Sequence, residues 1–252
     1  MIVQILILIG LTIAAIAYGA VPRPHKKRIV FSDTPDQPKP FGYRMSWLAV
    51  RTTDTAAVLE AMELAEVKPA NWNSGIGAIY SDLLSDSYVF VSPPVKGWTF
   101  VSGVPLPHPF GRNFIDKLTP MLAVLSARFP DVQYFASFPI IDFFGWARVQ
   151  KGRLVRAFII GDDGVILDRG RLTPEERALG LKLFDLRGIK DRIGDAGGAI
   201  VLHPTQDQVL RLARGWSLDP IFIDKTSAEA GLGFIARAPA SWRPERVKKK
   251  AA

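Results

Sequence analysis

Two arginines on neighbouring predicted strands are the residues best placed to do chemistry in this 252-residue chain. Arg148 and Arg156 stand on either side of Lys151-Gly152, a pair typical of a two-residue hairpin turn. That turn pairs Ala147 with Arg156. It predicts one shared, otherwise apolar face of Phe143, Gly145, Ala147, Val149, Leu154, Arg156, Phe158 and Ile160. A turn one residue longer would swap the faces and bring Arg148 and Arg153 to this side.

A guanidinium on an apolar face must be paired inside the protein or reach water, because an uncompensated buried charge is too costly. One interpretation is therefore structural, an internal ion pair or a side chain whose charged end reaches solvent. The other is that Arg148 or Arg156 binds an anion or a partner. An enzyme built on them would have a pocket at the end of the sheet, with Asp142, Asp162 or Glu175 as acid or base.

Most other chemistries are missing from the sequence. The chain has no cysteine, and its three histidines (His25, His108 and His203) show no metal-binding spacing. Gly75-Ile76-Gly77 and Gly231-Leu232-Gly233 lack the spacing of a phosphate-binding loop and are typical of turns. We therefore predict no metal, no cofactor and no catalytic residue.

Tryptophans supply the second group of candidate binding residues. Trp72 and Trp216 are predicted in loops, whereas Trp98 and Trp146 are predicted in strands, where packing in the sheet is the simpler interpretation. Aromatic and arginine side chains are the usual anchors of protein interfaces. The candidate binding residues are thus Arg148, Arg156, Trp72, Trp146 and Trp216.

The formal charge of +8 is concentrated at the two ends of the chain. Arg23, Lys26, Lys27 and Arg28 face no acid in the first 32 residues, and residues 237–252 carry six basic residues against Glu245. The middle of the chain is close to neutral. Because binding of DNA or RNA needs a clustered basic face, we predict no nucleic-acid partner.

Residues 1–21 form an apolar segment without a charged side chain, long enough for a transmembrane helix. Basic residues follow it and none precedes it, so the positive-inside rule predicts a single-pass anchor in the cell (inner) membrane with a cytoplasmic body. Arg23, Lys26, Lys27 and Arg28 would flank the anchor, and the basic ends could contact anionic lipid headgroups. A cleaved signal, with a periplasmic or secreted body, is the alternative.

The pattern beyond the anchor predicts three further regions. Residues 22–42 contain five prolines and basic residues, typical of an extended linker. Residues 43–236 carry the hydrophobic periodicity of one globular domain, and residues 237–252 are predicted to be a basic, disordered tail.

Adjacent strand pairs dominate the predicted elements. Strands are expected at 45–51, 87–92, 98–102, 131–138, 142–150, 153–160 and 165–168. Helices are expected after Thr53 or Asp54, after Asn113, after Thr173, and at 205–214 with a stop at Gly215. The apolar stripe of the helix after Asn113 consists of Phe114, Leu118, Leu122, Leu125 and Phe129. Strands that follow one another directly favour an α+β fold, an antiparallel sheet or meander packed by several helices.

Three sequence blocks are specific enough to suggest a relationship. They are GWTFVSG at 97–103, LS..F..VQYF at 125–135 and GWAR...G..VRAF at 145–158, joined by Glu176 and WSLDP at 216–220. Together they resemble an uncharacterised bacterial family associated with immunity-like proteins of toxin and secretion loci. The resemblance covers residues 45–223 and implies binding of a protein partner, with no catalytic residue.

We therefore expect a membrane-anchored, non-enzymatic binding protein, immunity-like in function, with a protein partner. An enzyme with an arginine and carboxylate pocket at the end of the sheet is the alternative.

Overall fold

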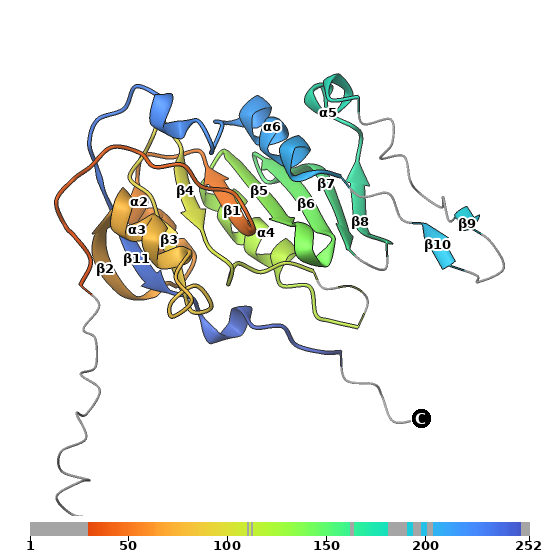
Figure 1. The fold of residues 1–252 in the computed structure, drawn as a ribbon, viewed down its shortest axis with the longest axis horizontal. Helices are drawn as coiled ribbons and strands as arrows, with labels where there is room; N and C mark the ends of the chain where they lie inside the picture. Colours follow the sequence, from red (N-terminus) through yellow and green to blue (C-terminus); the bar gives the residue numbers. More distant parts are fainter. Residues whose placement is uncertain are drawn as a thin grey trace, which may run out of the picture. The chain divides into compact units, whose positions relative to one another are not determined.

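A nine-stranded antiparallel sheet organises the chain (Figure 1). The computed structural model describes residues 30–109, 111, 113–161, 164–180, 191–193, 198–200 and 204–247. Across the sheet the order is β2 (Ala65–Asn71), β11 (Leu232–Arg237), β3 (Tyr88–Val91), β4 (Thr99–Ser102), β1 (Met45–Val50), β5 (Asp131–Phe138), β6 (Phe143–Gln150), β7 (Arg153–Gly161) and β8 (Gly164–Gly170). A separate pair joins β9 (Asp191–Ile193) to β10 (Gly198–Ile200).

Helices cover both faces of this sheet. Val58 of α2 (Thr55–Ala61) and Leu122 of α4 (Leu118–Arg128) belong to the hydrophobic cluster on one face. The other face is covered by α3 (Trp72–Ile79) and α6 (Gln206–Trp216), with α5 (Pro174–Ala178) against α6. The predicted α+β class and antiparallel sheet are confirmed.

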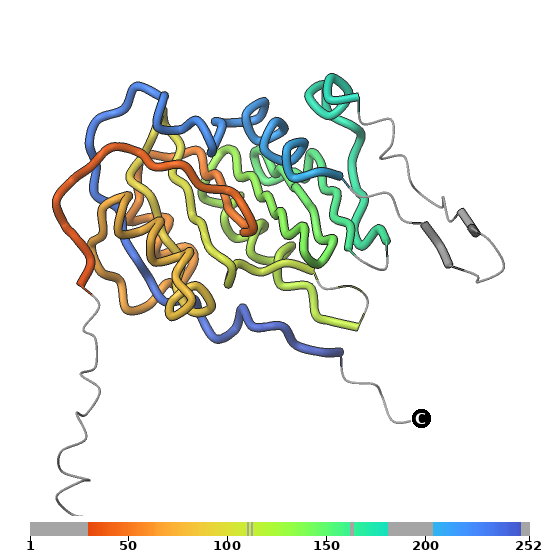
Figure 2. The backbone as a smooth tube through the Cα atoms, in the orientation of Figure 1, coloured from red at the N-terminus to blue at the C-terminus, as the bar shows by residue number. Residues whose placement is uncertain are grey.

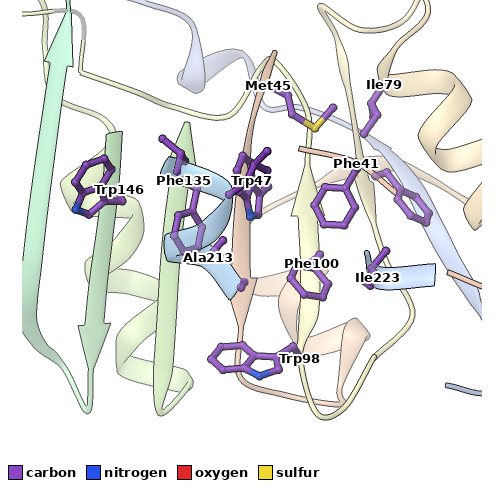
Figure 3. Close-up of a cluster of buried hydrophobic side chains, with 14 of the residues drawn as sticks. Phe41, Met45, Trp47, Ile79, Trp98, Phe100, Phe135, Trp146, Ala213 and Ile223 are labelled. Carbon is purple, nitrogen blue, oxygen red and sulfur yellow. The ribbon is translucent and has the colours of Figure 1, made fainter. Parts of the chain in front are cut away.

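Side chains along the central strands point alternately to the two faces of the sheet, and each face has its own hydrophobic cluster. In β1, Met45, Trp47 and Ala49 point into the cluster shared with α3 and α6, whereas Leu48 and Val50 point into the opposite one. Figure 3 shows the first cluster, in which Trp47 stacks on Phe135 of the neighbouring strand with ring centroids 5.2 Å apart. Because both faces are covered, all six residues of β1 are buried.

The folded unit extends beyond its predicted limits of 43 and 236. At the beginning, Phe41 is fully buried, and Asp36 bridges to Gly231 in the C-terminal part of the chain. Figure 2 shows this N-terminal segment, in red, beside the blue segment that follows α6. At the end, Ile115 N–H donates to the carbonyl of Glu245 and Val247 N–H to that of Asn113. Residues 31–42 and 237–247 are thus packed parts of the unit and not linker or tail.

Most predicted elements exist, with shifted ends and five omissions. The α4 helix begins at Leu118, because Asp116 and not Asn113 accepts hydrogen bonds from its first N–H groups. The α6 helix runs through Gly215 to Trp216. Helix α3 and the strands β2, β9, β10 and β11 were not predicted from the sequence.

In the part of the chain that the structure describes, no helix is long and apolar enough to cross a membrane. The predicted anchor at 1–21 and its flank of Arg23, Lys26, Lys27 and Arg28 lie outside the described residues, as do residues 248–252 of the predicted tail. The anchor stays a prediction.

Candidate functional site

Four of the five candidate binding residues meet in one polar network on the α6 side of the sheet. At its centre is Glu176 of α5, which is fully buried. One of its carboxylate oxygens, Oε1, accepts a hydrogen bond of 2.8 Å from Arg156 Nε and another of 2.8 Å from Trp146 Nε1. Arg156 also forms an ion pair with Asp168 of β8 and is only 2% exposed.

Local sequence places Glu176 at this point. Thr173, Pro174 and Glu176 form a capping box, in which Glu176 Oε2 accepts from Thr173 N–H at 2.7 Å and Thr173 Oγ1 accepts from Glu176 N–H at 3.2 Å. The same hydroxyl oxygen accepts a hydrogen bond from Trp216 Nε1 at 3.4 Å. The Glu176 carboxylate therefore caps α5 and also neutralises the Arg156 guanidinium.

Arg148 has its own acidic partner. Its Nη2 lies 2.6 Å from Asp131 Oδ2, and its guanidinium lies over the Trp216 ring, 5.6 Å from the centroid. Gln133 donates from Nε2 to the carbonyl of Trp216 at 3.0 Å. Strand β5, strand β6 and the end of α6 are joined by these contacts.

The predicted register of the hairpin is wrong beyond its first pairs. The turn Lys151-Gly152 has two residues, and Val149 pairs with Leu154 as expected. One extra residue in β7, Val155, then shifts the register, so that Arg156 pairs with Arg148 and not with Ala147. Both arginines consequently point to the same face as Trp146. The opposite face of β6 carries Gly145, Ala147 and Val149.

The two tryptophans predicted in loops are helix residues. Trp72 is the first residue of α3 and Trp216 the last of α6, and both are buried. Trp72 lies away from the network and stacks on Phe41 with ring centroids 6.3 Å apart. Trp98 is also buried, with the Arg51 guanidinium over its ring.

These contacts give the arginines a structural role. Arg148 and Arg156 are each neutralised by a carboxylate within the unit, which leaves neither charge to an external anion. Of the predicted acids, Asp142 ends a short helical turn after β5 and Glu175 lies on α5, whereas Asp162 is outside the described residues. Among the described residues, no ion pair of the kind that the enzyme hypothesis requires joins Asp142 or Glu175 to Arg148 or Arg156.

The opposite face of the same strands carries a groove, which the sequence did not indicate. It lies between α4 and strands β6–β8 and has a volume of about 290 Å³. Its floor consists of small or medium side chains, chiefly Ala147, Ala157 and Val149. Ala147 of β6 pairs directly with Ala157 of β7, and two small side chains side by side leave the space under α4 open.

The α4 helix presents an uncharged outer surface beside this groove. Of its residues, only Arg128 is charged, and Arg128 pairs with Glu60 of α2 at 3.0 Å. Of the exposed positions of α4, Pro120, Ala123, Val124 and Ala127 are apolar, and Thr119 carries an uncharged hydroxyl. Surface helices normally direct charged residues to water, so this composition indicates a face that meets another apolar surface.

Arg169 of β8 is the one charged residue among the described residues that line the groove. Its side chain is exposed, and no acid pairs with it in the described part of the chain. Leu154, 42% exposed, also lines the groove. The signal for this site in the sequence was the run LTPMLAVLSAR, with one charge in eleven residues.

Comparison of the chain with protein-family models, with curated proteins and with solved structures found no match.

Proposed function

We propose that this protein is a non-enzymatic binding protein that holds a protein partner in the groove between α4 and β8. In this proposal residues 1–21 tether it to the cell membrane, with the body in the cytoplasm. The observation that carries the proposal is the open apolar groove beside the uncharged surface of α4. Exposed apolar patches of this kind mark protein interfaces.

The chemistry of the groove defines the partner. Leu154 and the alanines of α4 supply apolar contact, and Arg169, which no acid pairs with among the described residues, supplies a positive charge at the side of β8. The complementary segment has an apolar face and a carboxylate that reaches Arg169. The resemblance to immunity-like proteins makes a toxin the first partner class to test.

Affinity purification of the full chain from cells that naturally produce it tests this function. We compare the wild type with Leu154→Asp and Arg169→Glu, which place a negative charge in or beside the groove. The matched control is Leu83→Asp, because Leu83 is 79% exposed and lies outside the groove lining.

The expected result is a protein in stoichiometric amount with the wild type and Leu83→Asp, but not with the two groove variants. Recovery that is equal in all four, or no stoichiometric protein with the wild type, would contradict the proposal. Circular dichroism of each variant separates lost binding from lost folding.

A further inference from the structure

A cavity of about 510 Å³ lies at one end of the sheet, apart from the groove. Antiparallel pairing brings the ends of β4, β5 and β11 and the start of β3 to one edge of the sheet, and the cavity is lined by the segments that leave these strands. Its volume is typical of small-molecule sites, which occupy about 300–1,000 Å³.

Aromatic rings and prolines form a large part of the wall. Trp242 comes from the C-terminal segment and Phe138 from the end of β5, and four lining residues are prolines. The His108 ring lies 5.9 Å from that of Phe138 and 5.0 Å from that of Phe143, and Leu106 provides its backbone carbonyl to His108 Nδ1 at 3.1 Å. Walls of flat rings fit an aromatic ligand, because ring pairs are favourable at centroid distances of about 4.5–7 Å.

Three charged residues line the cavity in the described part of the chain, namely Asp86, Arg237 and Arg243. Of the two arginines, Arg243 is the one without an acidic partner among the described residues. Arg237 donates to Glu66 at 2.7 Å, which lowers the pKa of the Glu66 carboxyl and neutralises Arg237. Arg243 is exposed, and no ion pair or side-chain hydrogen bond engages its guanidinium among the described residues. Asp86 is an exposed carboxylate on the same lining.

We propose that this cavity binds a small aromatic anion, with the ring system against Trp242 and His108 and the anionic group on Arg243. An arginine guanidinium matches the two oxygens of a carboxylate or a phosphate. Asp86 repels the same group and limits its affinity. None of these residues lines the groove, so this site is independent of the proposed function.

Calorimetric titration of the full chain in lipid nanodiscs, against empty nanodiscs, tests the proposal. The probes are 2-naphthoate and 2-naphthyl phosphate, with neutral 2-naphthamide as the isostere. The variants are Arg243→Gln, Asp86→Asn and, as a matched control, Arg246→Gln. Arg246 is in the same segment but stacks over Phe114 outside the cavity lining.

We expect saturable binding of an anion to the wild type and Arg246→Gln, about tenfold weaker binding to Arg243→Gln, and tighter binding to Asp86→Asn. The amide should bind about tenfold more weakly than its anion. Tighter binding of naphthoate or of the phosphate identifies which anionic group the site prefers. Quenching of Trp242 emission should follow the same curve, since the other five tryptophans are buried.

Absence of saturable binding to the wild type would overturn the proposal. Equal affinity of amide and anion, or an affinity unchanged by Arg243→Gln, would overturn it as well. Trp242→Phe in the same titration should abolish the fluorescence change while the calorimetric signal remains.

Discussion

Arg156 and Arg148 lie directly opposite each other on β7 and β6. Like charges in a cross-strand pair repel each other, so each guanidinium needs its own carboxylate. Arg148 has Asp131 from β5, and Arg156 has Glu176 from α5 and Asp168 from β8. The pair therefore ties two helices and four strands together on one face, while Ala147 and Ala157 lie on the other face of β6 and β7, in the lining of the groove.

Removal of the central carboxylate should be strongly destabilising. Glu176→Ala leaves the buried Arg156 guanidinium short of a partner and removes the acceptor of Trp146, and loss of one partner of a buried pair costs about 3–5 kcal/mol. The control is Glu175→Ala, since Glu175 has no role in the capping box. Urea unfolding followed by near-ultraviolet circular dichroism should give that loss for Glu176→Ala and little change for Glu175→Ala. Equal losses would contradict the assigned role of Glu176.

Two glycines in α3 provide a matched test of its packing. A Cβ on Gly75 would collide with the Phe90 ring, whereas a Cβ on Gly77 would meet nothing within 4 Å. Gly75→Ala should therefore lower the free energy of unfolding by about 1–3 kcal/mol. Gly77→Ala should raise it by about 0.5–1 kcal/mol, because alanine is the better helix former. Urea unfolding of both variants measures the difference, and a stabilising Gly75→Ala would show that α3 does not pack on β3 as described.

His108 should make stability depend on pH. Burial lowers the pKa of this histidine below its ordinary 6.5, so the unfolded chain binds a proton that the folded protein resists. Because the unfolded state then binds more protons, the His108 contribution is present above 6.5 and is lost as the pH falls from 6.5 toward the lower folded value.

The measurement for His108 is the free energy of unfolding between about pH 7.5 and about pH 5. The wild type should lose more stability over this range than His108→Gln, which carries no titrating group at that position. A steeper loss in the variant would reverse the sign and contradict the burial of the ring.

The membrane anchor is tested by topology reporters. C-terminal fusions to a reporter active only in the cytoplasm should be active, and the chain should remain in the membrane fraction. These results are expected because four basic residues come directly after the apolar segment. An external signal, or a shortened soluble chain, would favour the periplasmic or secreted alternative.

The sequence predicts correctly those elements whose structure depends on residues close together in the chain. The turn Lys151-Gly152 and the start of a helix after Thr173 depend on neighbouring residues, and both occur as predicted. The bulge at Val155 has no such signal in the strand itself. It depends on Gly170 of the next strand, where a Cβ would collide with the Val155 carbonyl oxygen.

Long-range contacts explain the larger omissions. Trp72 is followed by Gly75 and Gly77, which weaken the helical pattern of α3. The Asn71 side chain caps the helix locally by accepting from Ser74 N–H. The Asp36 carboxylate, 36 residues before Trp72, accepts hydrogen bonds from the N–H groups of Trp72 and Asn73. Likewise, the groove arises from the packing of α4 against strands that follow it, which periodicity within α4 does not reveal.

The central claim, that the groove holds a protein partner, is tested most directly by photocrosslinking in cells. A benzophenone amino acid replaces Ala123, which is exposed and lines the groove, and a control chain carries it at Leu83. The account predicts one protein adduct from position 123 and none of that mass from position 83. That adduct should disappear with Arg169→Glu and persist with Arg169→Lys. An adduct of twice the chain's mass, one unchanged by Arg169→Glu, or lipid adducts alone would contradict the claim.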